Sequence, residues 1–227
     1  MRRAVFTSGL LATWVVCGSL VSAQQPTRIS VGDTSHARQS LRLYLSPIRV
    51  DSGYRLTPNG YSGATHVQQT VDFADRRDTA RVAPVVGVLT RAIDTWNGVQ
   101  FVSPQLAGPF QLSGFFSGHL DFITNKPTFD VEIALYELTA TGDYVLVSNY
   151  STQHSPHDSQ RTPLQTGIRQ HLDYQTSRLP AREIHNGSRL VVLVTILRQT
   201  DMSDDLSEPL KISWYGDSYI ELHVGRE

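Results

Sequence analysis

Cysteine is almost missing from this sequence, and that shortage narrows what the protein can be. The single cysteine, Cys17, lies among the first 23 residues. If these residues are removed as a leader, the remaining chain has no cysteine, which excludes disulfide bonds, thiol catalysis and cysteine-ligated metal. The fold then has to be stabilised by an ordinary apolar core. The 204 residues that remain of 227 are enough for one domain with such a core.

An excess of basic side chains is also missing. The chain has 20 Lys and Arg against 21 Asp and Glu, and removing Arg2 and Arg3 with the leader leaves 18 against 21. Attraction to phosphate groups requires a basic patch, so we expect no nucleic acid among the partners. The 16 Gly and 11 Pro suit a turn-rich globular chain and are too few for a disordered or collagen-like one.

The first 23 residues have the three parts of a secretory signal peptide. Residues 1–3 form a short basic start, residues 4–20 are mostly apolar and uncharged, and residues 21–23 (Val-Ser-Ala) resemble an A-x-A cleavage site. This predicts a periplasmic or extracellular protein of a bacterium, with no membrane attachment after cleavage. A retained anchor, a lipoprotein at Cys17 and a twin-arginine leader stay open as weaker alternatives.

Apolar side chains alternate with polar ones along much of the chain, which predicts strands. In residues 110–122, Phe110, Leu112, Phe116 and Leu120 share one face, as in a strand with one buried face. Asn186-Gly187 is a strong turn dipeptide, and it opens the β-branched run 190–197, which we interpret as a central strand covered on both faces.

Further strands are expected at 41–45, 67–71, 99–102, 129–136, 144–147, 210–214 and 219–224. Residues 84–94 are either a loop or a short helix, and helical periodicity is otherwise scarce. About ten short strands with frequent turns predict an all-β fold, a jelly-roll β-sandwich. We place this sandwich at residues 40–225, after a flexible polar segment at residues 24–39.

No motif supplies a catalytic nucleophile, a metal site or a cofactor site. Residues 60–64 (Gly-Tyr-Ser-Gly-Ala) come closest to the nucleophile elbow G-x-S-x-G, but they fail at the last position and no helical pattern follows, which favours a surface turn. Residues 154–158 (His-Ser-Pro-His-Asp) gather two imidazoles and a carboxylate in an irregular spacing, and a solvated loop is favoured over a metal site. The phosphate-loop, dinucleotide and calcium-loop motifs are absent from the sequence.

Three aromatic residues are candidates for a sugar-binding platform. They are Trp96, which precedes Asn97-Gly98, and the pair Trp214-Tyr215 at the end of an expected strand. Aromatic side chains bury a large area wherever they fall, so core packing or a domain-docking surface is the favoured alternative.

Several ordered blocks of sequence resemble one family. The resemblance covers about residues 40–225 and rests on residues 43–45, 71–75, 101–104, 112–122, 125–126, 129–131, 135–138, Asp158, Arg161, Gly167, 187–192, 209–214 and 218–220. These blocks are similar to the C-terminal domain of CocE/NonD-family serine hydrolases, a domain type also called the X-Pro dipeptidyl-peptidase C-terminal non-catalytic domain. Two departures concern loops: Thr166 stands where the family usually has Pro, and residues 199–208 look shorter than the corresponding loop.

The resemblance implies a galactose-binding-domain-like jelly roll without catalytic residues of its own. In the family the nucleophile, base and aspartate lie in a preceding α/β-hydrolase domain, whereas only 17 residues separate the expected leader from Leu41. The segment matching residues 84–90 approaches the catalytic cleft in full-length relatives. We therefore choose Val88 and Leu89 as docking candidates, with core burial as their alternative, and we add the aromatic residue Trp96 as a third candidate.

Three functions stay open from the sequence. The first is a secreted accessory domain that packs on an α/β-hydrolase partner or retains only the ancestral fold, with a homo-oligomer as the other partner considered. The second is one part of an assembled ester, amide or X-Pro peptide hydrolase, whose catalytic domain is a separate chain. The third is a free-standing module that binds carbohydrate or another small ligand, which only the analogy of fold supports.

Overall fold

The computed structural model describes residues 39–61, 64–77, 83, 85–154, 163–198 and 208–224, and almost all of its regular structure is β-strand. The expected leader, the segment 24–38 and Cys17 lie outside the described residues. The strands are β1 (Gln39–Val50), β2 (Gly53–Thr57), β3 (His66–Val71), β4 (Leu89–Thr90), β5 (Gly98–Val102), β6 (Phe110–Thr124), β7 (Asp130–Leu138), β8 (Tyr144–Ser151), β9 (Gln170–Gln175), β10 (Leu179–Ile184), β11 (Arg189–Leu197), β12 (Leu210–Tyr215) and β13 (Tyr219–Val224). A short 3-10 turn, η2 (Thr152–His154), follows β8.

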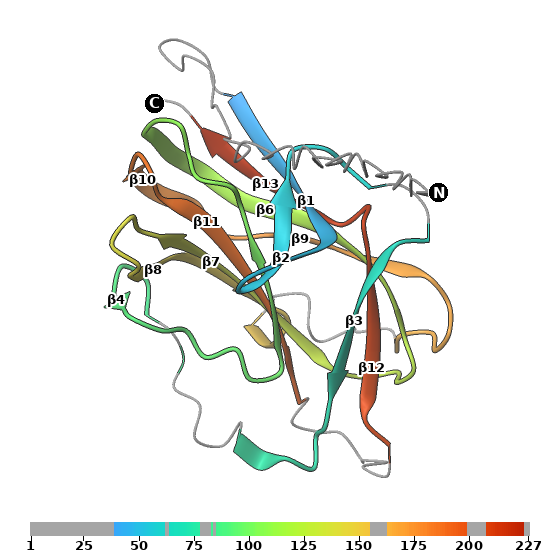
Figure 1. Cartoon of the computed structure of the whole chain (residues 1–227). Coiled ribbons are helices and arrows are strands. Elements are labelled where there is room, and N and C mark those ends of the chain that lie inside the picture. Colours follow the sequence, from blue (N-terminus) through green and yellow to red (C-terminus); the bar gives the residue numbers. More distant parts are fainter. Residues whose placement is uncertain are drawn as a thin grey trace, which may run out of the picture.

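The strands form one hydrogen-bonded path that curls into a sandwich (Figure 1). Their order is β3-β12-β6-β13-β1-β2-β5-β11-β7-β8-β4, and β9 and β10 pair with β6 beside this path. Among the described strands, β2 and β5 pair in parallel, while the other pairings are antiparallel. The rings of Tyr150 in β8 and Tyr174 in β9 lie 5.2 Å apart, so the path returns on itself across the core. The predicted all-β class is confirmed.

The long strand β6 organises one side of the sandwich. Phe110, Leu112, Phe116 and Leu120 point into the core and are at most 3% exposed, as the alternation predicts. β6 pairs with β12 and β13 along one edge and with β9 and β10 along the other. Gly118 allows a close approach here, because a Cβ at this position would lie 2.5 Å from the carbonyl oxygen of Tyr219.

Strand β11 is covered on both faces, as its unbroken apolar run predicts. Leu190, Val192 and Val194 belong to the main core, while Val191 and Leu193 belong to a second cluster on the opposite face. β11 lies between β5 and β7, so its backbone groups are paired on both edges.

All the strands expected from alternation are present, with somewhat different ends. The structure adds β2, β4, β9 and β10, which the sequence pattern did not indicate. The expected loop or short helix at residues 84–94 contains a two-residue strand, β4, and no helix among its described residues. The first described strand, β1, pairs with the last one, β13, and Gln39 lies opposite Val224.

Candidate functional site

The docking candidates Val88 and Leu89 lie on the surface. They are 49% and 58% exposed, and Val85 and Val86 beside them are 62% and 51% exposed. The alternative of core burial is therefore wrong for Val88 and Leu89. We call these four residues (85, 86, 88 and 89) the apolar ridge.

Hydrogen bonds to β8 hold the apolar ridge in place. Leu89 pairs with Val145, and the Gly87 backbone N–H donates to the Leu146 carbonyl at 2.8 Å. Gly87 has a φ of +82°, a conformation that favours glycine. β4 lies at the end of the strand path, on the side of the molecule opposite β3 and β12 (Figure 1).

A second apolar cluster forms on the outer side of the sandwich without the ridge residues. Six buried residues on the outer face of the β5-β11-β7-β8 layer form this cluster, and Ile93 packs against it. They are Val102, Ala134, Tyr136, Leu146, Val191 and Leu193. The ridge side chains are not part of this cluster, and they face solvent.

Trp96, the third docking candidate, belongs to a separate cluster. It is half-buried, its indole Nε1–H donates to Asp75 Oδ2 at 3.4 Å, and the Arg77 guanidinium carbon lies 5.4 Å from its ring centroid. A hydrogen bond from Arg77 holds the pKa of Asp75 below its ordinary value. Trp96 thus joins the loop before β5 to the segment after β3.

The proposed aromatic platform at Trp214-Tyr215 is not formed. Trp214 is 1% exposed, and its indole Nε1–H donates to Gln69 Oε1 at 2.7 Å. Tyr215 is half-buried, and the guanidinium of Arg169 lies 4.2 Å above its ring. The alternative of core packing is confirmed for Trp214.

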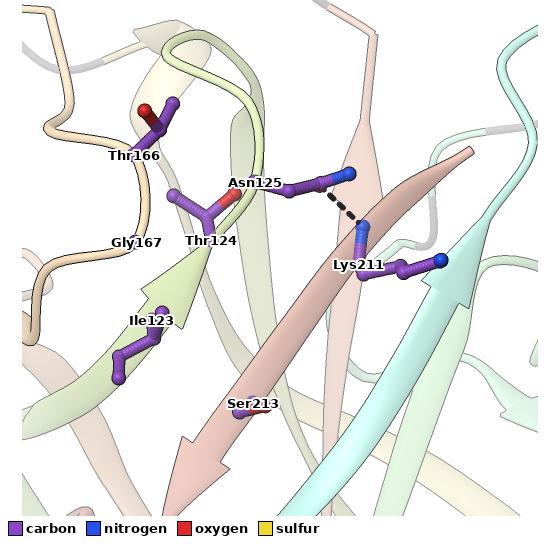
Figure 2. Close-up of a pocket in the computed structure, with 7 residues that line it drawn as sticks. All are labelled: Ile123, Thr124, Asn125, Thr166, Gly167, Lys211 and Ser213. Carbon is purple, nitrogen blue, oxygen red and sulfur yellow. Dashed lines mark hydrogen bonds between the residues drawn. The ribbon is translucent and has the colours of Figure 1, made fainter. Parts of the chain in front are cut away.

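A hollow of about 430 Å³, lined by both polar and apolar atoms, lies between β6, β12 and residues 166–167 (Figure 2). Ile123 and Ser213 are register partners, and Thr166 and Gly167 face them from the neighbouring loop. Asn125 closes one end, where its side-chain oxygen accepts a hydrogen bond from the Lys211 backbone N–H at 2.7 Å. Figure 2 shows the Lys211 side chain extending away from Thr166, and Lys211 is among the residues that line the hollow.

Glu137 forms a buried polar network that the sequence pattern did not indicate. Its side chain is 0% exposed, and Oε1 accepts hydrogen bonds from the His185 backbone N–H, the His185 ring Nδ1 and the Ser188 hydroxyl, each at 2.9 Å. Arg182 lies 3.3 Å from Oε2. Burial alone would raise the pKa of Glu137, but these hydrogen bonds outweigh it and lower the pKa below 4.5.

The Glu137 network does not have the order of a catalytic triad. In a triad the serine hydroxyl bonds to the histidine, and the histidine bonds to the carboxylate. Here Ser188 and His185 bind the same carboxylate oxygen separately. The arrangement holds the turn at residues 185–188 against β7, which is a structural role.

A histidine pair lies on the outer face of β6 and β9. The rings of His119 and His171 stack at 5.0 Å, and His119 Nδ1 is 2.7 Å from Asp173 Oδ1. Across the described ranges, no group of three or more His, Cys, Asp or Glu has an arrangement that could hold a metal ion. The metal candidate at residues 154–158 and the elbow serine Ser62 lie largely or wholly outside the described residues.

Comparisons with known proteins place this fold among hydrolase structures. No protein-family model matches the chain, and a search of curated proteins finds no relative. Among solved structures, an alpha-amino acid ester hydrolase matches 82% of this chain at 18% identity with a TM-score of 0.58. An aminopeptidase from a marine-sediment Thaumarchaeota archaeon matches 83% at 12% identity and 0.58, and a CocE/NonD family hydrolase from Staphylococcus aureus matches 83% at 12% and 0.57.

At these identities the likeness concerns the fold. The chain spans only 36–37% of the length of these hydrolases, so its fold corresponds to one part of them. No helix in the described residues is long and apolar enough to cross a membrane.

Proposed function

We propose that this protein is an exported, non-catalytic accessory domain related to the C-terminal domain of CocE/NonD hydrolases, and that it docks on an α/β-hydrolase partner through the apolar ridge. The observation that carries the proposal is the partial match: the whole described fold corresponds to little more than a third of each similar hydrolase. We expect a domain of this kind to present a surface on which the other two thirds of such a hydrolase can dock.

The apolar ridge supplies that surface. Val85, Val86, Val88 and Leu89 are adjacent in sequence and each about half exposed or more. Contiguous exposed apolar side chains on a globular protein mark interaction sites more often than isolated ones do. The family resemblance points to the same segment independently, since the corresponding residues approach the catalytic cleft in full-length relatives.

The described residues also favour a non-catalytic role. The carboxylate that meets both a serine and a histidine is Glu137, and its geometry is structural rather than that of a triad. Acyl transfer needs the nucleophile, the base and the oxyanion hole on one rigid scaffold. In the proposed function the partner supplies all three groups.

Partner capture tests the docking proposal. The exported protein, tagged at its C-terminus, is used to capture proteins from the medium or periplasm of its own host, and captured proteins are tested for esterase activity. We expect an α/β-hydrolase that lacks this type of domain, and we expect Leu89→Lys to prevent capture. Ile168→Lys is the matched control, because Ile168 is 54% exposed but lies outside the ridge.

Two results would contradict the proposal. Equal capture of the hydrolase by wild type and Leu89→Lys would remove the ridge from the docking surface. Labelling of the purified protein by a serine-reactive phosphonate, together with turnover of an ester, would show catalysis by this chain alone. If the captured hydrolase is inactive without this chain, the complex is the assembled hydrolase of the second hypothesis.

A small-ligand function has one specific observation in its favour, the hollow between β6 and β12. Its volume is within the range of ligand sites, and Ser213 and Thr166 are among its lining residues. A glycan array with calorimetry tests this function. Absence of binding removes it without affecting the accessory-domain proposal.

A further inference from the structure

Asparagine followed by glycine occurs three times in this sequence, and the structure places the three pairs in different surroundings. They are Asn59-Gly60, Asn97-Gly98 and Asn186-Gly187. In such a pair the glycine backbone nitrogen can attack the asparagine side-chain amide, because glycine has no Cβ to hinder the approach. The attack requires the glycine N–H to give up its proton, so a hydrogen bond donated by this N–H slows the reaction.

The pair Asn97-Gly98 is held most tightly. The Gly98 N–H donates to the Thr95 carbonyl at 2.9 Å. The Asn97 carbonyl accepts hydrogen bonds from Gln69 Nε2 at 2.6 Å and from the Ile196 N–H at 3.0 Å. These three hydrogen bonds fix the peptide group between the two residues, so the Gly98 nitrogen is not free to attack.

The pair Asn186-Gly187 is protected to a smaller degree. Asn186 is exposed at the turn before β11, but the Gly187 N–H donates to the Leu106 carbonyl at 3.2 Å. The next residue, Ser188, is bonded to the buried carboxylate of Glu137, which holds this turn in place. The Gly187 hydrogen bond has to open before its nitrogen can react.

The pair Asn59-Gly60 has neither form of protection. Both residues are exposed in the connection that follows β2, and no described residue accepts a hydrogen bond from the Gly60 N–H. The position also suits glycine, because a Cβ built on Gly60 would lie 3.1 Å from the Tyr44 ring. Packing against Tyr44 therefore disfavours the larger side chains that would hinder the attack.

We infer that Asn59 is a site of spontaneous modification, where the folded protein deamidates faster than at Asn97 or Asn186. The Gly60 nitrogen loses its proton and forms a bond to Asn59 Cγ, while the bond from Cγ to Nδ2 breaks and Nδ2 leaves as ammonia. Water then opens the resulting succinimide ring at either carbonyl. The product at position 59 is aspartate or isoaspartate, and each carries a negative charge at neutral pH.

Incubation of the purified exported protein in mildly alkaline buffer, followed by peptide mapping with mass spectrometry, tests the inference. Deamidation at Asn59 should be about 2- to 10-fold faster than at Asn186, because the Gly187 hydrogen bond has to break first, and Asn97 should react most slowly. The same protein unfolded in guanidinium chloride is the matched control. Its three rates should converge, because unfolding removes the hydrogen bonds that distinguish the three pairs.

Asn59→Gln gives a second readout, because glutamine would have to close a larger ring and reacts more slowly. The side chain of Asn59 is exposed, so we expect the variant to keep the fold. Aged wild type should accumulate an acidic species on ion-exchange chromatography, and Asn59→Gln should lose most of it. The inference is overturned if Asn97 or Asn186 reacts as fast as Asn59 in the folded protein, or if the acidic species is unchanged in Asn59→Gln.

Discussion

Replacing Glu137 should destabilise the protein more than replacing any surface carboxylate on the same layer. Glu137→Ala removes a fully buried carboxylate. The Ser188 hydroxyl, the His185 N–H groups and Arg182 then lose the oxygen atoms that accept their hydrogen bonds. Removing one partner of a buried charged network costs about 3–5 kcal/mol. The Arg182 and His185 side chains are 28% and 67% exposed, so water replaces part of the loss, and we expect about 3 kcal/mol, at the lower end of this range.

Glu137→Gln separates the charge from the shape. The amide oxygen can still accept hydrogen bonds, but charge-assisted bonds are about twice as strong as neutral ones, so the expected loss is about 1.5 kcal/mol. Glu183→Ala is the control: Glu183 is exposed on β10, next to Arg182, and a surface change of this kind costs at most about 0.5 kcal/mol. Urea unfolding followed by tryptophan fluorescence measures all three differences.

The pH dependence of the same variants checks the role of the charge. The pKa of Glu137 is lowered in the folded protein, so its contribution to stability is fully present above the ordinary value of 4.5 and is lost as pH falls through the folded pKa. Wild type and Glu137→Gln should therefore converge in stability in acid. A loss below about 1 kcal/mol for Glu137→Ala, or a wild-type advantage over Glu137→Gln that is the same at pH 3 and pH 7, refutes the reasoning.

Two further predictions concern the region where β6 meets β9. The Tyr174 hydroxyl is buried and has no hydrogen-bond partner in the described part of the chain, and burial raises its pKa. Because an unsatisfied buried hydroxyl is costly, Tyr174→Phe should increase the free energy of unfolding by about 1 kcal/mol in urea titrations. Gly118→Ala should lower it by about 2 kcal/mol, because the added Cβ would meet the Tyr219 carbonyl oxygen at 2.5 Å and the Tyr174 ring at 2.7 Å. Tyr174→Phe should not rescue Gly118→Ala, since the clash with the Tyr219 backbone stays; rescue would show that the hydroxyl alone causes the strain.

The fold was predictable wherever one face of a strand is apolar. β6 and β11 follow directly from alternation and from an unbroken apolar run, and their burial agrees with both patterns. β9 and β10 were not predicted, because as strands on a free edge of β6 they bury few side chains and their sequences are mostly polar. Pro180 in β10 further weakened the strand pattern, although proline is acceptable on an edge.

The candidate site was predictable only in part. Val88 and Leu89 were chosen from a family resemblance, whereas the hydrophobicity of the segment alone favoured burial. Their exposure follows from the tertiary arrangement, in which a second apolar cluster drawn from β5, β7, β8 and β11 forms without them. Glu137 was missed because a single acidic residue in an alternating strand usually indicates a solvent-facing position.

The pairing of β1 with β13 has a consequence for how the protein reaches its native state. The first described strand can complete its ladder only after residues 219–224 have been synthesised, because Gln39 lies opposite Val224 and Tyr44 opposite Tyr219. Contacts between residues so distant in sequence have a high contact order and form slowly, in milliseconds to seconds for all-β domains. The growing chain therefore cannot complete its native sandwich until the last of these strands has been synthesised, and the early strands wait without their final partner until then.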